Sequence, residues 1–261
     1  MKLSISNIAW TPEDDEYVYS LMQKYDFCGL EIAPTRIISE CPYDNIPSAV
    51  EWYEGLNRAY GFVIPSMQSI WFGRQEKIFG SSEERKALID YTKKAIDFAS
   101  ALNCKNLVFG CPRNRSVPDG ADSSGAVDFF RIIGEYALSK GTVIGMEANP
   151  PIYNTNFIND TPSALELIEK VDCKGFLLNL DIGTMLHNNE PISLLEGRVK
   201  SINHVHISEP GLKPIERRDM HRELLELLAS ESYDRFVSVE MGKDGRGVIE
   251  PTLEYIKSVF R

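Results

Sequence analysis

The amino-acid sequence predicts an α/β fold, a single-domain (β/α)₈ TIM barrel, and three observations carry this prediction. Apolar or β-branched runs typical of strands recur eight times, stretches of helical periodicity separate them, and the length of 261 residues suits one such barrel. Strict alternation of strand and helix is typical of a parallel sheet, and eight units predict that this sheet closes into a ring. We therefore expect one barrel domain over residues 1–261.

The predicted elements follow one another in strict order along the chain. The eight strand-like runs occupy residues 3–10, 29–34, 62–71, 106–112, 142–150, 175–183, 202–208 and 236–242. Helical periodicity between them is clear over residues 14–26, 81–103, 126–141, 161–172 and 218–232.

Several of these helices carry start or stop signals. Thr161 is a candidate cap before Pro162, which suits the first turn of a helix. Residues 81–84 read Ser-Ser-Glu-Glu and place carboxylates where the helix dipole favours them. Gly141 is a plausible C-terminal stop. These local signals agree with the helices that the periodicity predicts.

A doubly wound open sheet is the main alternative architecture. Its nucleotide-binding form should show a GxGxxG turn after the first strand, but residues 8–14 read IAWTPED. The polar segment 114–124 follows the fourth strand-like run and is best interpreted as a long loop. Such loops shape the substrate pockets of barrel enzymes, so the barrel remains the preferred architecture.

The composition is that of a globular chain, with 43% hydrophobic and 25% charged residues. The net charge of −10 argues against a nucleic-acid partner, because binding to phosphates needs clustered lysine and arginine. The five cysteines form no CxxC pair, which favours a reducing, cytoplasmic location over a disulfide framework. We see no signal-peptide pattern and no apolar run near the roughly 20 residues of a membrane helix, so we expect a soluble protein with no membrane partner.

Four polar side chains stand at the ends of the last four strand-like runs. They are Glu147, Asp181, His206 and Glu240. In a parallel barrel, residues at the carboxyl ends of neighbouring strands converge on one mouth, where such barrels carry their chemistry. Three carboxylates and one imidazole suit a single divalent cation such as Mn²⁺, Mg²⁺, Co²⁺ or Zn²⁺. The sequence therefore predicts a metal site at this mouth.

With these residues in place, the chain resembles the xylose isomerase-like TIM barrel superfamily over essentially its whole length. This superfamily includes isomerases and epimerases of sugars and sugar phosphates. In its ketose 3-epimerase branch, two Glu, one Asp and the second His of an HxH pair bind one divalent metal. The resemblance implies that Glu147, Asp181, His206 and Glu240 are the metal ligands. Because side chains alternate along a strand, His204 should lie on the same side as His206 but deeper in the barrel.

The resemblance also implies a proton-transfer reaction on a small carbohydrate. A hydrogen next to a carbonyl is too weakly acidic for an isolated carboxylate, but a metal ion that polarises the adjacent oxygens stabilises the developing enediolate. One carboxylate can then remove the proton and the opposite one can return it on the other face. By this resemblance Glu147 and Glu240 are the acid/base pair as well as metal ligands.

Three positions depart from the ketose 3-epimerase pattern. A His is usual three residues after the strand-six Asp, whereas this chain has Thr184 there and His187 three residues further on. A second Glu and an Arg are usual where this chain has Tyr153 and Leu212. The metal ligands survive while the residues that orient the sugar do not. A different polyol, a keto-sugar or a sugar phosphate therefore joins the expected substrates.

Further side chains are candidates for substrate contacts. Trp10, Gln68 and Trp71 end the first and third runs, where aromatic walls can pack on a sugar ring, with an apolar plug or a dimer contact as the alternative. Phe72 fits the dimer contact better. A homo-oligomer is therefore possible. Glu31 ends the second run and suits a substrate hydroxyl, with internal pairing as the alternative.

The remaining candidates lie on later segments. Arg115 suits a phosphate or carboxylate, although a surface loop with ordinary ion pairs is slightly favoured. Asn149, two residues after Glu147, is a candidate substrate contact. His187 either replaces the missing family histidine or is a solvated loop residue, while His204 is a hydrogen-bonded group near the site rather than a fifth ligand.

Two other functions remain open at this stage. The same metal-stabilised enediolate can eliminate a β-hydroxyl, which would make the protein a lyase or dehydratase of a keto-sugar or inosose. A non-catalytic sugar-binding barrel is the alternative from another class, and the intact set of four ligands argues against it. The superfamily also holds abasic-site endonucleases with more histidines and a basic face, which four histidines and an acidic chain do not match.

Overall fold

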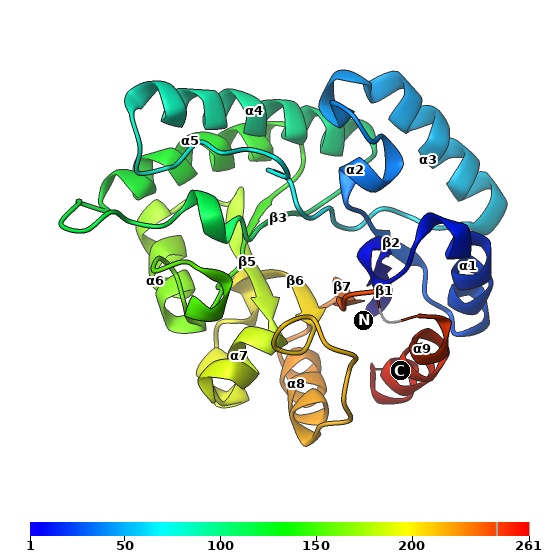
Figure 1. Ribbon diagram of the computed structural model, residues 1–261. Helices are drawn as coiled ribbons and strands as arrows, with labels where there is room; N and C mark the ends of the chain where they lie inside the picture. Colours follow the sequence, from blue (N-terminus) through cyan, green and yellow to red (C-terminus); the bar gives the residue numbers. More distant parts are fainter. Residues whose placement is uncertain (244, 261) are drawn as a thin grey trace.

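The computed structural model describes residues 1–243 and 245–260 and confirms an α/β fold on one parallel sheet (Figure 1). Within these residues the sheet has seven strands: Lys2–Ser6 (β1), Gly29–Glu31 (β2), Leu107–Phe109 (β3), Ile144–Met146 (β4), Phe176–Asp181 (β5), Ile202–Ile207 (β6) and Phe236–Val239 (β7). They lie in the order β2-β1-β7-β6-β5-β4-β3, and every neighbouring pair is parallel. The first and last strands of the chain are thus neighbours, as a barrel requires.

The third predicted strand is the one that does not form a regular ladder. Val63 makes an isolated parallel bridge to Gly29 of β2, and Met67 makes two, to Ile32 just after β2 and to Leu107 of β3. Pro65 lies between them and has no backbone N–H, so a continuous ladder cannot pass through it. The segment still joins the two edge strands β2 and β3. The prediction of eight regular strands was therefore wrong by one, while the ring arrangement is retained.

Helices follow each strand or bridging segment and lie outside the strands (Figure 1). Among the described residues they are Asp15–Lys24 (α1), Pro34–Ile37 (α2), Ile46–Tyr60 (α3), Ser82–Ala101 (α4), Gly125–Ser139 (α5), Thr161–Val171 (α6), Ile182–Asn188 (α7), Asp219–Ser230 (α8) and Arg246–Phe260 (α9). The five helices predicted from periodicity are confirmed as α1, α4, α5, α6 and α8. No helix in the described part of the chain is both long and apolar enough to cross a membrane.

The helix ends show which local signals were correct. α4 starts with a reciprocal cap, in which Ser81 accepts from the backbone of Glu84 and the Glu84 carboxylate accepts from the backbone of Ser81. The predicted cap of α6 is shifted by one residue, because Asp160 and not Thr161 accepts the Ser163 N–H at 2.7 Å. Gly141 adopts a φ of 75° just beyond α5, which confirms the predicted stop.

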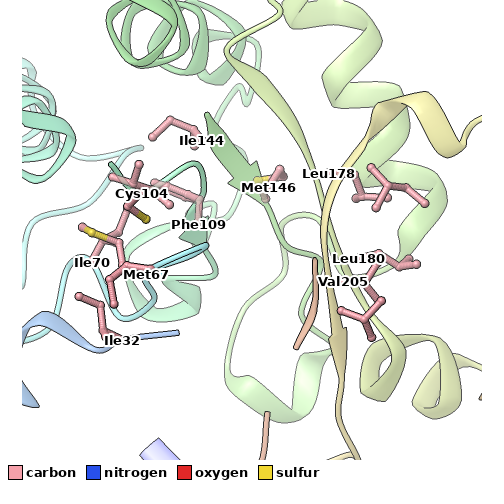
Figure 2. Close-up of a cluster of buried hydrophobic side chains, with 14 of the residues drawn as sticks. Ile32, Met67, Ile70, Cys104, Phe109, Ile144, Met146, Leu178, Leu180 and Val205 are labelled. Carbon is pink, nitrogen blue, oxygen red and sulfur yellow. The ribbon is translucent and has the colours of Figure 1, made fainter. Parts of the chain in front are cut away.

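Alternating side chains give the strands two faces of opposite character. Leu178, Leu180 and Val205 belong to the buried apolar cluster drawn in Figure 2, which packs between the strands and the helices. The residues that alternate with them point into the barrel. The register places Asn179 beside His204 and Asp181 beside His206. TIM barrels usually fill their interior with branched apolar residues. Here much of the interior is polar, and this is where the site forms.

Candidate metal centre

The four residues expected to bind metal converge at the carboxyl ends of four adjacent strands. Glu147 directly follows β4, Asp181 ends β5, His206 lies on β6 and Glu240 directly follows β7. One potential ligand atom from each lies within 4.8 Å of the others. Three of the side chains are buried and Asp181 is half-buried. The parallel register therefore produces the cluster that the sequence predicted.

His206 occupies the centre of the cluster. Its Nδ1 atom lies 3.0 Å from Oε1 of Glu147 and 3.2 Å from Oε2 of Glu240. Its Nε2 atom lies 2.9 Å from Oε2 of Glu31, which comes from β2 on the far side of the barrel. A proton on Nε2, shared with Glu31, would leave the lone pair of Nδ1 directed at the cluster. Metal-binding histidines are commonly oriented in this way by a carboxylate.

The charges of the cluster are unbalanced without a cation. Burial raises the pKa of Asp181 to about 6, and the nearby Glu147 carboxylate adds to that increase. Burial also raises the pKa of Glu240 to about 7, although His206 opposes this. Burial alone would lower the pKa of His206, but Glu240 and Glu31 outweigh it and raise that pKa well above its usual range. These shifts mean that the buried carboxylates compete for positive charge, which a divalent cation would supply.

The donor set therefore fits a bound divalent metal. Three carboxylate oxygens and one imidazole nitrogen within reach of a single point suit Mn²⁺, Mg²⁺, Co²⁺ or Zn²⁺. A second group of possible ligands, formed by Glu31, His204 and His206, lies below the first and shares His206 with it. Because Nε2 of His206 is already directed at Glu31, the group of Glu147, Asp181, His206 and Glu240 is the candidate metal site.

Glu31 lies beneath the cluster and does not reach the pocket above it. Its carboxylate is completely buried, and its Oε1 atom accepts a hydrogen bond from Nε2 of Gln68 at 3.2 Å. Burial would raise its pKa, but His206 and His204 together hold it well below the usual range. Of the two alternatives for Glu31, contact with a substrate hydroxyl or internal pairing, the structure shows internal pairing. His204 lies 3.2 Å from the same carboxylate, and burial lowers its pKa.

Glu147 is held by two amide side chains, one of which depends on Arg115. Asn179 donates to its Oε1 at 2.9 Å and Asn149 donates to its Oε2 at 3.1 Å. Arg115 donates in turn to Oδ1 of Asn149 at 2.9 Å and to the Glu147 carbonyl oxygen at 2.8 Å. Arg115 thereby fixes the orientation of the Asn149 amide, and this amide in turn holds the Glu147 carboxylate.

The position of Arg115 corrects an expectation from the sequence. Its side chain is fully buried, 0% exposed, and burial lowers its pKa to about 10. We expected either a contact with an anionic substrate or, slightly favoured, a surface loop with ordinary ion pairs, but the guanidinium group turns inward. The reason is that the surrounding carbonyl and amide oxygens satisfy both of its terminal nitrogens. Arg115 is therefore placed to support the site and not to touch a ligand.

Asp181 is held by two neighbours, of which Ser208 was not among the candidates from the sequence. Its Oδ1 accepts the backbone N–H of Thr184 at 2.6 Å, and its Oδ2 accepts the hydroxyl of Ser208. Asn179 was likewise missed, although the inward alternation of 179 and 181, and of 206 and 208, was a signal that could have found both residues. Gly110 was missed without any such signal: a Cβ there would lie 2.9 Å from Oε2 of Glu147.

A pocket of about 180 Å³ opens above the cluster. Gln68 and Asn149 line it, as expected for substrate contacts, beside Glu147, Asp181 and Glu240. The chain also places Tyr153, Leu212 and Glu209 in its wall. Tyr153 and Leu212 are two of the three positions that depart from the ketose 3-epimerase pattern, the third being Thr184. These two departures therefore lie on the wall that would meet a substrate.

Glu209 and Tyr153 also fix the loop that closes one side of this pocket. Arg218 donates to both carboxylate oxygens of Glu209, at 2.7 and 2.6 Å. The Tyr153 hydroxyl accepts the backbone N–H of Gly211 at 2.9 Å. The loop between β6 and α8 is therefore anchored on two sides, and Leu212 is presented to the pocket at a φ of 55°.

Three predicted contacts lie outside this pocket. Trp10 donates to Oδ1 of Asp15 at 2.7 Å, and Trp71 donates to the Thr92 hydroxyl at 2.8 Å, so both indoles are turned into the core. His187 is exposed in the last turn of α7 and does not replace the missing family histidine. None of the three side chains lines the pocket above the cluster, because sequence position at a strand or loop end does not fix the direction of a side chain. Trp71 instead lines a neighbouring cavity.

His221 is the fourth histidine of the chain and is not part of the cluster. It lies within the first turn of α8, where it is completely buried. Its Nδ1 atom is 2.9 Å from the Tyr255 hydroxyl of α9, and burial lowers its pKa to about 4. His221 thus packs two outer helices together and has no place at the mouth.

Comparison with known proteins gives the same fold over the whole chain. No curated protein matches the sequence. Among solved structures, 3-keto-D-glucoside 4-epimerase from E. coli has a TM-score of 0.76 at 18% identity, covering 99% of this chain and 98% of that one. D-psicose 3-epimerase with D-tagatose from Clostridium cellulolyticum H10 has a TM-score of 0.75 at 18% identity, covering 99% and 91%.

A further structural relative was solved with metal. The IOLI protein with a bound zinc atom has a TM-score of 0.70 at 17% identity, covering 99% of this chain and 96% of that one. At such identities these likenesses show the fold alone. A family model described as xylose isomerase-like TIM barrel matches residues 24–259. The chain therefore belongs to the xylose isomerase-like TIM barrel family.

Proposed function

We propose that this protein is a divalent-metal-dependent isomerase or epimerase of keto-sugars. The observation that carries the proposal is the placement of two glutamates around one metal-binding histidine. Glu147 and Glu240 come from β4 and β7, the strands that flank β5 and β6, and lie 3.0 and 3.2 Å from Nδ1 of His206. The sugar epimerases among the structurally similar proteins support this substrate class.

The metal would be held by the two glutamates, Asp181 and Nδ1 of His206. When bound, it polarises a carbonyl oxygen of the sugar and makes the neighbouring C–H more acidic. The pocket above the cluster is where the sugar would lie, with Gln68 and Asn149 as hydrogen-bonding groups in its wall. Half-buried and buried carboxylates are effective here because little water competes for the proton.

The two glutamates would divide the proton transfer between them. One carboxylate accepts the hydrogen bound to carbon next to the carbonyl, and the other returns a proton to the opposite face. Asn179 and Asn149 hold both oxygens of Glu147, which fixes its direction. Such fixed geometry is what proton transfer to and from carbon requires. Inversion at that carbon is the expected outcome.

The test is hydrogen exchange in D₂O with a panel of ketoses, inososes and sugar phosphates. We expect the manganese-loaded protein to introduce deuterium next to the carbonyl of its substrate, detected by NMR. Glu147→Gln and Glu240→Gln should each lower turnover by about 10²–10⁴-fold, because Gln keeps the shape but cannot accept the proton. Glu54→Gln, at an exposed position on α3, is the matched control and should keep full activity.

The outcomes separate the possible chemistries. Full activity of either metal-loaded Gln variant would refute the two-glutamate mechanism. Loss of water from the substrate, together with exchange, would move the assignment to a lyase or dehydratase. Sugar binding without exchange or turnover of any compound in the panel would favour a non-catalytic sugar-binding protein.

A further inference from the structure

A second cavity adjoins the metal pocket and is larger. Its volume is about 450 Å³, compared with about 180 Å³ for the metal pocket. Ser69, Cys111 and Pro112 line both, so the two cavities share one wall. Small-molecule sites in proteins usually measure about 300–1,000 Å³, a range that the metal pocket alone does not reach. The two cavities together do reach it.

The shared wall is built from backbone in an unusual conformation. Ser69 has a φ of 55° and Cys111 a φ of 43°, the left-handed region that non-glycine residues rarely adopt. Each begins a tight turn, with Phe72 N bonded to Ser69 O at 3.0 Å and Asn114 N bonded to Cys111 O at 3.1 Å. Such backbone costs about 1–3 kcal/mol per residue and is concentrated at ligand sites. Residues of both turns line the second cavity.

An exposed aromatic ring stands at this cavity. Phe72 is 70% exposed, whereas its neighbour Trp71 is only 3% exposed and is fixed by its hydrogen bond to Thr92. Trp71 also packs edge-on against Phe109 at 4.7 Å between ring centres. The buried indole of Trp71 thus fixes the chain next to Phe72, whose exposed ring lines the cavity. Flat faces of sugar or aryl rings pack well on such a side chain.

Three cations line the cavity, and two of them, Arg74 and Lys77, are engaged with other protein groups, while Arg113 is exposed. Arg74 forms an ion pair with Glu76, and its guanidinium group stacks on Tyr91 at 4.7 Å. Lys77 donates to the carbonyl oxygen of Arg113. A phosphate would be a small ligand for this volume and would have to compete for these cations. A ring is therefore the better match to the cavity.

From this wall and ring we propose that the cavity, which we call the distal subsite, binds the second ring of a glycoside whose keto-sugar unit lies at the metal. This inference rests on the proposed function, because the first ring is placed by the metal pocket. The substrate would then be a glycoside, with a sugar or aryl group as its aglycone, and not a free monosaccharide. Tyr153 and Leu212, in place of charged family residues, agree with a different substrate.

The experiment measures binding of matched probe pairs by isothermal titration calorimetry to the manganese-loaded protein. The probes are the methyl and phenyl β-D-glucosides, galactosides and xylosides, which differ only in the group that would enter the distal subsite. We expect at least one phenyl glycoside to bind about five- to tenfold more tightly than its methyl partner. Phe72→Ala should bring that ratio close to about 1, because the stacking ring is lost. Ile132→Ala, an exposed apolar residue on α5, is the control and should keep the ratio.

Several results would overturn the distal subsite. Equal affinities within every pair, or no binding of any probe, would exclude a glycoside subsite. An unchanged ratio in Phe72→Ala would exclude the stacking wall. Dissociation of an oligomer by Phe72→Ala, measured by light scattering, would assign the ring to a subunit contact instead. The proposed function fails separately, when the wild-type protein takes up no cation or gives no exchange in D₂O with the substrate panel.

Discussion

The inward and outward faces of β5 and β6 are built from consecutive residues but have opposite roles. Outward, Leu180 and Val205 pack into the apolar layer beneath the helices. Inward, Asp181 and His206 stand side by side in the register and contribute two of the four cluster groups. Because successive side chains point to opposite faces, one strand stabilises the fold with every second residue and carries polar chemistry with the others. Stability and metal binding should therefore be separable by single substitutions.

The largest effect is expected on the inward face. The wild-type protein should bind about one divalent cation per chain, and Asp181→Ala or His206→Ala should weaken binding by more than about 100-fold, because even outer-shell partners cost about 10–100-fold. The fold should persist because the apolar layer is untouched. Calorimetric metal titration with circular dichroism checks both statements. A wild-type protein that stays metal-free after reconstitution with Mn²⁺, Co²⁺, Mg²⁺ or Zn²⁺ contradicts the metal site.

The reverse pattern is expected on the outward face. Leu180 is completely buried, so Leu180→Ala should lower the free energy of unfolding by about 2–5 kcal/mol through lost burial and a cavity. Metal affinity of the folded protein should not change. Urea denaturation gives the stability, with Leu138→Ala, at 49% exposure on α5, as the control. Equal stability of the two variants would show that the outward face does not carry the core.

Arg115 is expected to be an exception, because a single substitution there should change both stability and metal binding. Arg115→Ala leaves the Glu147 carbonyl and the Asn149 amide oxygen without their donor, which should cost about 2 kcal/mol of stability and also weaken metal binding. Arg113→Ala, at an exposed neighbouring position, should change stability by less than about 0.5 kcal/mol. If Arg115→Ala weakened only the binding of anionic sugars, Arg115 would be a substrate-binding residue and not a support of the site.

The smallest effect concerns Glu31, which would act on a bound metal through His206. Glu31→Gln keeps the size of the side chain but removes the charge beside Nε2, so metal affinity should fall by about tenfold. Stability should change little, because Gln can still accept the hydrogen bond. Competition with a chelator at several pH values measures the affinity. An unchanged affinity across that range would show that Glu31 does not orient the histidine.

Much of the fold and the cluster was predictable because both depend on local periodicity. The helices α4 and α5 follow from apolar spacing and end signals, and Glu147 and Glu240 follow from their place after apolar runs. The third strand was not predictable in detail, because the effect of Pro65 depends on whether a neighbouring strand needs a backbone N–H at that position, which Pro65 cannot supply. Gly110 could not be found either, since its role depends on a carboxylate that approaches from β4.

The sequence by itself determined the barrel and the identity of the four cluster residues. The alternation of strands and helices along the chain can be recognised from the sequence. In any parallel barrel this alternation brings the ends of β4 to β7 to one mouth. Only the tertiary structure decided that Arg115 and Glu31 turn inward. It also decided that Trp71 is buried while the ring of Phe72 stays exposed. The physical reason is that a buried polar side chain must form hydrogen bonds, and its partners come from strands that are distant in the sequence.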